Sequence, residues 1–216
     1  MSELICHFED EYLLVLEKPS GLLCVPGRGP DKQDCMSARA QQRWSDALIV
    51  HRLDQATSGL VIMARSLAVQ RQLSQAFAER QVQKRYIAVV AGRLEPSPQI
   101  TAPQDWQLID LPIAADWERR PLRVINAETG KSSQTQWRVL AFEGEQTRVL
   151  LNPLTGRTHQ LRVHMAALGH PILGDALYAD PAIAASAPRL LLHATALEFM
   201  HPVHGHLLQL ESPPSF

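Results

Sequence analysis

Apolar residues recur along this chain with two periods, and each period predicts one type of element. Alternating or continuous apolar runs that end at turn residues indicate strands. Spacings of three and four residues indicate amphipathic helices. We expect strands at residues 12–17, 60–64, 84–92, 132–142, 147–152, 190–199 and 206–211, and helices at 34–44, 66–80 and 159–168.

Polar residues and glycine indicate where the helices begin and end. Asp34 is expected to cap the first helix and Ser66 the second, because their side chains can accept the free N–H groups of a first turn. Gly169 suits the position that follows the last turn of the third helix. The second helix should bury an apolar face made of Leu67, Val69, Leu73 and Phe77.

The connections between these elements predict the fold class. Glu143-Gly144-Glu145 separates two alternating segments, which is typical of an antiparallel hairpin. Residues 93–121 contain five prolines and predict a long connection with at most one short strand. With 216 residues, 45% of them apolar, the chain can bury a substantial core. We therefore expect an α+β fold, a central mainly antiparallel or mixed sheet flanked by helices, in a single domain over residues 1–216.

The charge of the chain argues against one way of binding nucleic acid. A net charge of −1 counts against a domain that holds RNA by overall charge, because such domains are commonly basic. Acidic residues gather in residues 3–17. Basic residues gather elsewhere, as Lys84 and Arg85, as Arg119, Arg120 and Arg123, and as Arg157 and Arg162. This uneven distribution permits a local basic face, although solvated surface arginines explain it equally well.

The sequence predicts neither secretion nor membrane insertion. Residues 1–11 are acidic and lack the basic and apolar regions of a signal peptide. No apolar run approaches the roughly 20 residues that span a bilayer. Cys6, Cys24 and Cys35 lack metal-binding spacing and are expected to be free thiols in a reducing cytosol. We therefore expect a cytoplasmic protein.

A polar loop precedes the continuous apolar run at Leu60–Ala64. Residues 51–59 lead directly into this run, which predicts a buried strand, so the loop is expected to be held at a sheet edge. Asp54 is a carboxylate on this supported loop. Of the side chains of Arg52 and Asp54, one can face a pocket while the other reaches outward. On these residues alone, an aspartate that caps its own turn, with Arg52 as a surface partner, is the simpler interpretation.

The loop residues His51-Arg52-Leu53-Asp54-Gln55-Ala56-Thr57-Ser58-Gly59 resemble the catalytic-loop signature of the RluA-type pseudouridine synthases. Further stretches resemble motifs of the same family, in the same order along the chain. These are Lys18–Leu22, the segment around Tyr86, Gly156–His164 around Arg162, Gly169–Asp175, and Leu190–Ala194 around His193. The resemblance runs from about residue 12 to the C-terminus. It implies the pseudouridine synthase fold and an isomerase that converts uridine in RNA to pseudouridine.

That reaction breaks the N-glycosidic bond, turns the uracil and joins its C5 to the same sugar carbon, without a metal or redox cofactor. The resemblance implies that Asp54 is the catalytic carboxylate, either as a nucleophile on the sugar or ring or as a base at C2′. It implies that Arg162 pairs with Asp54, and a paired guanidinium lowers the pKa of a carboxyl group by roughly 1–3 units. It implies that the ring of Tyr86 lies against the uracil and that its hydroxyl helps to remove the C5 proton. Without the resemblance, Arg162 would be a helix-surface residue and Tyr86 a core residue.

The resemblance also implies residues that contact RNA. Arg52 matches a residue that fills the gap left by the flipped uridine, and His51 precedes it in the same motif. Lys84 and Arg85 make an RNA-facing edge more plausible than a dry one beside Tyr86.

Two other pairs of residues keep two interpretations each. Arg157 and His159 are explained by phosphate contact or by packing at the start of a helix. Leu191 and Leu192 are explained by a wall of the uracil pocket or by a core strand.

Two features favour other reaction classes. The segment His201–His206 has a spacing that could bind zinc, but a polar hairpin turn is the simpler explanation. Asp175 could pair with Asp54 as in a glycoside hydrolase, but it also matches the turn motif of the family. We therefore expect no metal and no cofactor.

Within the family, three stretches resemble the short members with dual specificity, which are Asp116-Trp117, Arg120-Pro121 and Glu128–Lys131. As in those members, we expect no S4 domain. These members modify one uridine in a 23S rRNA stem-loop and one in a tRNA anticodon loop, which implies recognition of a small folded stem-loop. We expect RNA as the partner, no membrane, and a monomer. The alternatives are the same chemistry on another rRNA or tRNA uridine, and a noncatalytic RNA-binding protein on the same scaffold.

Overall fold

The computed structural model describes residues 4–96 and 105–216. The chain divides into two compact units. The first contains the residues up to Lys84 and residues 193–215, and the second contains residues 85–192 and Phe216. The boundaries fall inside two strands, β5 (Gln83–Ala91) and β11 (Leu192–Met200).

The first unit is built on a mixed sheet. Besides most of β11, its elements are β1 (Ile5–Glu9), β2 (Leu13–Lys18), β3 (Leu48–Ile49), β4 (Ser58–Ala64), β12 (Leu207–Glu211), a 3-10 helix (Pro30–Lys32), α1 (Met36–Arg43) and α2 (Leu67–Ala78). The strand order is β1-β2-β4-β11, with β3 beside β4 and β12 beside β11. β4 and β11 are parallel, whereas β1–β2, β2–β4, β3–β4 and β11–β12 are antiparallel.

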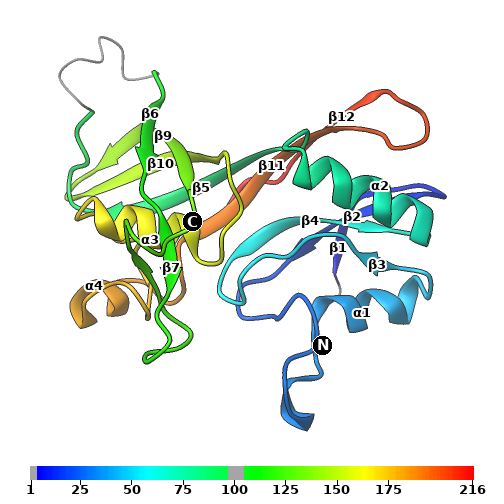
Figure 1. The fold of residues 1–216 in the computed structure, drawn as a ribbon, viewed down its shortest axis with the longest axis horizontal. Helices are drawn as coiled ribbons and strands as arrows, with labels where there is room; N and C mark the ends of the chain where they lie inside the picture. Colours follow the sequence, from blue (N-terminus) through cyan, green and yellow to red (C-terminus); the bar gives the residue numbers. More distant parts are fainter. Residues whose placement is uncertain (1–3, 97–104) are drawn as a thin grey trace. The chain divides into compact units, whose positions relative to one another are not determined.

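β4 lies in the middle of this sheet, and all of its residues are buried. Leu60 and Ile62 of β4 share a core cluster with Val69 and Leu73 of α2. Figure 1 shows α1 and α2 on opposite sides of this sheet. Burial on both faces explains why residues 60–64 form a continuous apolar run instead of an alternating one.

At the start of β4, the backbone of the parallel strand β11 comes very close. Gly59 has a φ of +115°, and a Cβ at this position would lie 2.5 Å from the backbone nitrogen of Ala194 on β11. Only glycine fits at this point. The close approach therefore sets where the loop before β4 enters the sheet.

The predicted helix ends of this unit are confirmed in one case and wrong in the other. Ser66 caps α2, because its hydroxyl oxygen accepts the N–H of Val69 at 3.3 Å. α1 begins at Met36 after Cys35, so Asp34 lies too early to cap it and instead forms an ion pair with Arg39 at 2.6 Å. Val69 and Leu73 are buried as predicted for α2, but its first residue, Leu67, is 61% exposed.

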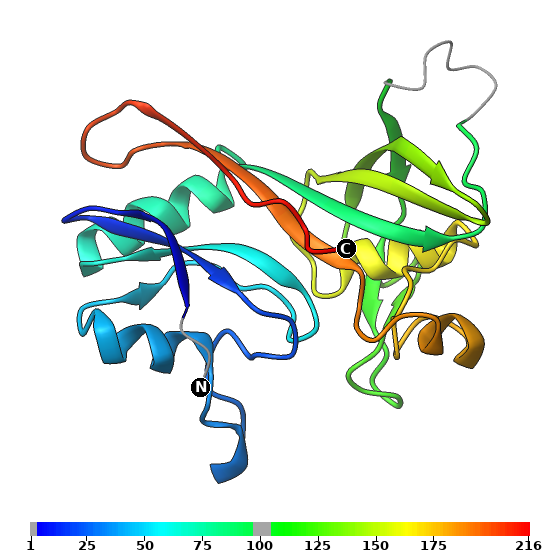
Figure 2. The same ribbon diagram turned by 180° about the vertical axis from the view of Figure 1, so that it is seen from behind.

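The second unit combines an antiparallel sheet with a small hairpin. Besides most of β5, its elements are β6 (Gln107–Asp110), β7 (Ile113–Ala115), β8 (Arg123–Ile125), β9 (Gln134–Glu143), β10 (Gln146–Pro153), α3 (Gln160–Ala167) and α4 (Pro181–Ala185). The sheet order is β5-β10-β9-β6. β7 pairs with β8, and its first residue, Ile113, also forms an isolated antiparallel bridge with Lys131. Figures 1 and 2 show α3 on one face of the sheet.

Most of the predicted connections in this unit are confirmed. β9 and β10 form the predicted antiparallel hairpin, which turns at Gly144 with a φ of +63°. Gly169, with a φ of +82°, follows the last turn of α3 as expected. The expectation of at most one strand in residues 93–121 is wrong, because both β6 and β7 lie there. Residues 97–104 of this connection lie outside the described part.

α3 is attached to the sheet by buried polar side chains. The Gln160 side chain donates to the carbonyl oxygen of Gln134 at 2.9 Å and to the hydroxyl of Thr135 at 3.0 Å. His164 contacts the Thr135 hydroxyl at 2.9 Å through Nδ1 and the Leu111 carbonyl oxygen at 3.0 Å through Nε2. Burial lowers the pKa of His164. The helix therefore has a defined position on the sheet, and so does any side chain that it carries.

The two units confirm the predicted α+β class, with mixed and mainly antiparallel strands and few helices. β1, β3, β8 and α4 were not expected from the sequence. The three cysteines are free thiols, as predicted. Among the described residues, no helix combines the length and the apolar character that crossing a membrane requires.

Candidate active site

The loop that carries Asp54 is braced by the segment that follows β2. Lys18, the last residue of β2, is fully buried, and its Nζ donates hydrogen bonds to the carbonyl oxygens of Pro19 at 2.8 Å, Leu22 at 2.7 Å and Gln55 at 3.0 Å. Burial lowers the pKa of Lys18 to about 8, although the nearby charges of Cys24 and Asp54 act in the opposite direction. At neutral pH the ammonium is mostly protonated and can serve all three carbonyls.

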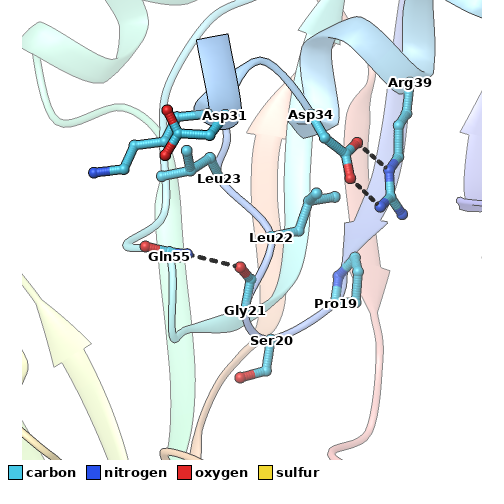
Figure 3. Close-up of a pocket in the computed structure, with 10 residues that line it drawn as sticks. Pro19, Ser20, Gly21, Leu22, Leu23, Asp31, Asp34, Arg39 and Gln55 are labelled. Atoms are coloured by element: carbon cyan, nitrogen blue, oxygen red, sulfur yellow. Dashed lines mark hydrogen bonds and ion pairs between the residues drawn. The ribbon is translucent and has the colours of Figure 1, made fainter. Parts of the chain in front are cut away.

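Four further hydrogen bonds join the same two segments. Gly21 and Gln55 are linked twice. Gly21 N–H donates to the Gln55 carbonyl at 2.8 Å, and Gln55 Nε2 donates to the Gly21 carbonyl at 3.0 Å, the bond drawn in Figure 3. The Ser20 hydroxyl donates to the Ala56 carbonyl at 2.7 Å. The N–H of Leu53 donates to Cys24 Sγ at 3.2 Å. The loop around Asp54 is therefore held on both sides of the aspartate. We call residues 18–24, which hold it, the brace.

Cys24 acts as part of this brace and not as a reactive thiol. Burial raises the pKa of its thiol, which disfavours the thiolate. A neutral sulfur can accept the weak hydrogen bond from Leu53, and the buried Leu53 side chain anchors the middle of the loop.

The two residues on either side of Leu53 differ in exposure. Asp54 is half-buried and Arg52 is exposed. The backbone carbonyl of Asp54 accepts the N–H of Thr57 at 3.1 Å, which closes the turn before β4. The loop thus presents a carboxylate from a fixed backbone and a cation toward solvent.

His51 supports the start of the loop. Its ring stacks on Phe77 of α2 at 4.3 Å between centroids, and its Nε2 accepts the N–H of Ile62 at 3.0 Å. Accepting this bond requires an unprotonated Nε2. Burial, with the nearby Lys84 ammonium, lowers the pKa of His51 to about 3. These contacts give His51 a supporting role, and its predicted contact with RNA stays a prediction.

A pocket of about 380 Å³ lies beside the brace. Figure 3 shows it lined by Pro19–Leu23, by Gln55, and by the Asp34–Arg39 ion pair. Asp54 is not among the lining residues. The pocket therefore borders the brace and not the carboxylate.

In the second unit, Arg162 is buried on α3 and forms a two-pronged ion pair. Its Nε lies 2.7 Å from Asp175 Oδ2 and its Nη2 lies 2.5 Å from Oδ1. Only 4% of Arg162 is exposed, so the interpretation as a helix-surface arginine is wrong. Such a paired geometry fixes the plane of the guanidinium.

Asp175 is itself committed to this support. It is fully buried, and its Oδ1 also accepts the N–H groups of Leu177 at 2.9 Å and Tyr178 at 3.2 Å. These bonds, together with the two from Arg162, occupy both carboxylate oxygens of Asp175. Asp175 is therefore poorly suited to be the general acid of a glycoside hydrolase, and that interpretation loses its support.

Tyr178 extends the support of Arg162. Its ring lies 5.0 Å from the Arg162 guanidinium. Its hydroxyl oxygen accepts the N–H of Arg123 at 3.0 Å and lies 2.6 Å from His159 Nδ1. His159 adopts a left-handed conformation with φ of +58° just before α3. Of its two interpretations, these contacts favour packing at the helix start.

The turn that carries Asp175 depends on glycine. Gly174 has a φ of +74°, and a Cβ there would lie 1.9 Å from the carbonyl oxygen of Arg189. This close approach explains why glycine precedes the aspartate in this turn.

Tyr86 and its neighbours lie on β5. Tyr86 is half-buried and faces Leu151 in the register of β10, so it is not part of the fully buried core. The Arg85 guanidinium lies 5.2 Å from the Trp106 ring. Lys84 Nζ lies 5.9 Å from the Phe77 ring, and burial, with the charge of Arg80, lowers the pKa of Lys84.

The remaining predicted residues have these positions. Arg157 is exposed, and its Nε donates to the Ser132 carbonyl at 3.3 Å. Leu191 is half-buried, and its N–H donates to the Leu173 carbonyl at 2.9 Å. Leu192 is buried.

The structure divides the predicted site residues between the two units. Asp54, Arg52, His51 and Lys84 belong to the first unit. Tyr86, Arg85, Arg157, Arg162, Leu191 and Leu192 belong to the second. The predicted pairing of Arg162 with Asp54 therefore stays a prediction.

Sequence analysis missed the residues that support the predicted catalytic side chains. In the sequence, Lys18 stands out only as part of the motif at Lys18–Leu22, yet a lysine at the end of an apolar strand can be a buried cation that needs partners. Asp175 was assigned to a turn, and its position 13 residues after Arg162 gives no local signal of their pairing.

The histidine cluster between β11 and β12 is a structural turn. His201 Nε2 lies 2.8 Å from Asp10 Oδ2, and its Nδ1 accepts the N–H groups of Val203 and His204. The rings of His201 and His206 stack at 5.1 Å. Across residues 4–96 and 105–216, no three His, Cys, Asp or Glu side chains are grouped to hold a metal ion. The polar hairpin turn is therefore the better interpretation.

Comparisons with known proteins show which family this chain is similar to. The family model described as RNA pseudouridylate synthase matches residues 12–167. The chain is 45% identical over 214 residues to the dual-specificity RNA pseudouridine synthase RluA of Escherichia coli (strain K12), covering 99% of this chain and 94% of that protein. It is 46% identical to the protein of the same name from Yersinia pestis, covering 99% and 100%. The solved structure of human RNA Pseudouridylate Synthase Domain Containing 1 is 29% identical, with a TM-score of 0.79 over 99% of this chain and 84% of that chain.

Proposed function

This chain belongs to the RNA pseudouridylate synthase family and is an RNA pseudouridine synthase, and from that premise we propose that Asp54, Tyr86 and Arg162 carry out the isomerisation. We propose further that the two units act together as a single catalytic domain. The observation that supports the role of Asp54 most is the brace, because five hydrogen bonds between residues 18–24 and the loop fix the backbone around this half-buried carboxylate.

The reaction rearranges the substrate without adding or removing atoms. The bond between the sugar C1′ and N1 breaks, a bond between C1′ and C5 forms, the proton on C5 leaves, and N1 gains a proton. Asp54 acts as a nucleophile on the sugar or the ring, or as a base at C2′. The ring of Tyr86 lies against the uracil, and its hydroxyl helps to remove the C5 proton.

Arg162 stabilises the carboxylate of Asp54 in this proposal. Asp175 orients the guanidinium through two hydrogen bonds, and the ring of Tyr178 lies over it. The guanidinium already shares its charge with Asp175, so its effect on a second carboxylate is smaller than that of an isolated arginine. Its main contribution is a donor in a set position.

The uridine has to leave the RNA stack before Asp54 can reach its sugar. Arg52 is the exposed cation of the braced loop, and we assign it to the gap that the uridine leaves. Lys84, Arg85 and Arg157 contact the RNA backbone, with His51 supporting Arg52 from the start of the loop. Leu191 and Leu192 form the wall of the uracil pocket.

The RNA substrate is a small stem-loop. The relatives that match almost the full chain are named dual-specificity enzymes. We propose that this protein likewise modifies a 23S rRNA stem-loop and a tRNA anticodon loop, acts in the cytoplasm, and is a monomer. Sequencing the pseudouridines of a strain that lacks the protein identifies the uridines that depend on it.

Substitution of the carboxylate tests the central assignment. Asp54→Asn should abolish tritium release from stem-loop RNA labelled at uridine C5 and leave RNA binding largely intact. Asp31→Asn changes an exposed carboxylate of the same unit and serves as the matched control. Full turnover by Asp54→Asn refutes the role of Asp54. If the unsubstituted protein binds the stem-loop but produces no pseudouridine detectable with carbodiimide, the protein is a noncatalytic RNA-binding protein.

A further inference from the structure

The hairpin formed by β7 and β8 carries an exposed indole at its tip. Trp117 is 71% exposed, whereas Trp44 and Trp137 are each only 5% exposed. Figure 1 shows the loop after β7 extending away from the sheet and helices of the second unit. An indole exposes a large apolar area, so this degree of exposure is costly without a partner.

The loop around Trp117 is closed by hydrogen bonds of its own. The N–H of Asp116 donates to the Leu122 carbonyl at 3.1 Å, and the N–H of Leu122 donates to the Arg119 carbonyl at 3.0 Å. The Asp116 carboxylate accepts the backbone N–H of Arg119 at 3.0 Å and its Nε at 2.8 Å. The backbone N–H of Arg119 is the main reason that the pKa of Asp116 is lowered. The tip is therefore ordered before any partner binds.

Two arginines flank the indole. The Cζ of Arg120 lies 3.9 Å from the centroid of the Trp117 ring, so the guanidinium covers one face of the ring. The exposed area must then lie on the opposite face and the ring edges. The side chain of Arg119 is itself 71% exposed, although it pairs with Asp116. The tip thus offers one flat apolar face beside two cations.

The base of the hairpin is attached to the support of Arg162. The N–H of Arg123, in β8, donates to the hydroxyl oxygen of Tyr178 at 3.0 Å. The Tyr178 ring in turn lies over the Arg162 guanidinium at 5.0 Å. The hairpin that would hold the RNA is therefore linked through Tyr178 to Arg162, a residue that we assign to catalysis.

We propose that Trp117 stacks on an unpaired base of the substrate stem-loop, with Arg119 and Arg120 beside the neighbouring phosphates. An aromatic face suits any unpaired base, and the adjacent guanidinium groups suit the RNA backbone. The inference rests on the proposed function, because it takes a stem-loop RNA as the substrate. It adds a contact that positions the RNA on the second unit.

The test is a comparison of stem-loop RNA affinities. Alanine substitution of a stacking aromatic typically weakens binding by about five- to 150-fold. Trp117→Ala should raise Kd in this range, and Trp117→Phe should recover most of the loss. Leu108→Ala removes another exposed apolar side chain of the same unit and is the matched control, with no change expected. Circular dichroism and thermal unfolding confirm that each variant is folded.

Two further measurements distinguish base stacking from a charge effect and from a folding defect. These are the salt dependence of Kd and the affinity for RNA with an abasic nucleotide. Because the indole carries no charge, Trp117→Ala should leave the dependence of log Kd on log salt unchanged, whereas Arg120→Gln should reduce that slope by roughly 0.7–0.9. An abasic nucleotide at one loop position should remove the difference between the unsubstituted protein and Trp117→Ala.

The outcomes are distinct. The proposal is overturned if Trp117→Ala binds the stem-loop within twofold of the unsubstituted protein, if Trp117→Phe loses as much affinity as Trp117→Ala, or if no abasic position removes the effect. An equal loss on a fully paired duplex also overturns it, because a duplex offers no unpaired base. A protein that shows the Trp117 effect but forms no pseudouridine refutes the proposed function and leaves this inference standing.

Discussion

Replacing Lys18 with methionine tests whether a buried cation holds the loop that carries Asp54. Methionine has a similar length and can fill the same space, so the substitution removes the charge and the donors with little change in packing. The three carbonyl oxygens of Pro19, Leu22 and Gln55 then lose their shared donor. Since Lys18 is fully buried, solvent cannot easily replace that donor.

The expected loss of stability follows from two opposing contributions. Hydrogen bonds from a charged donor contribute roughly 1.5–3 kcal/mol each, so three of them contribute roughly 4.5–9 kcal/mol. Burying the ammonium offsets part of this. The pKa of Lys18 falls from 10.5 to about 8, and at about 1.4 kcal/mol per unit the offset is about 3 kcal/mol. We expect Lys18→Met to lower the free energy of unfolding by about 2–6 kcal/mol.

Activity should fall more than binding. If the loop loses its brace, the Asp54 carboxylate moves relative to the sugar that it must reach, and a displacement of about 1 Å can cost about 100-fold in rate. Urea denaturation reports stability, and tritium release at saturating RNA reports kcat. Lys32→Met replaces an exposed lysine of the same unit and is the matched control. The reasoning fails if Lys18→Met unfolds within about 0.5 kcal/mol of the unsubstituted protein and retains its kcat.

Two other predictions follow from buried charges. The folded protein binds the Lys18 proton more weakly than the unfolded chain does. The free energy of unfolding of the unsubstituted protein, relative to that of Lys18→Met, should therefore rise by up to about 3 kcal/mol between pH 8 and 10.5. Urea denaturation of both proteins at pH 7, 9 and 10 measures this difference, and a difference that stays constant with pH would contradict the prediction. Asp175→Asn should lower the free energy of unfolding by about 3–5 kcal/mol, because it leaves the Arg162 guanidinium buried beside a neutral partner. Asp180→Asn is its control, since asparagine caps a helix as well as aspartate does, and equal stability of the two variants would argue against a structural Arg162–Asp175 pair.

Local pattern predicted the elements whose own residues determine them. The run at residues 60–64 indicates a buried strand in any context, and the Ser66 hydroxyl caps a helix through an N–H three residues away. The elements that were missed depend on distant partners. β6 forms because β9 lies beside it, and nothing in residues 107–110 themselves predicts that partner. The prediction for Asp34 is wrong because the same side chain can either cap a helix or form an ion pair with a residue close in the chain. In the structure it pairs with Arg39.

The candidate site shows the same division between local signals and tertiary partners. The motif around Asp54 indicated the carboxylate, but the carbonyl groups that surround Lys18 come from two segments more than 30 residues apart in the chain. Arg162 was recognised from its motif, yet its environment was not. A helix with buried polar residues on several sides has no clear amphipathic pattern, so sequence could not show that Arg162 faces inward.

The acceptors around Lys18 and Arg162 explain why one unit buries a lysine and the other an arginine. Around Lys18 the acceptors are single carbonyl oxygens that converge from separate backbone segments, and an ammonium can direct three donors at them. Around Arg162 the acceptor is one carboxylate, whose two oxygens match the parallel donors of a guanidinium. Arginine at position 18 could not place its planar donors on three converging carbonyls, and lysine at position 162 would lack the two parallel donors that meet the two oxygens of Asp175. Each residue is therefore determined by the geometry of its acceptors and not by its charge alone.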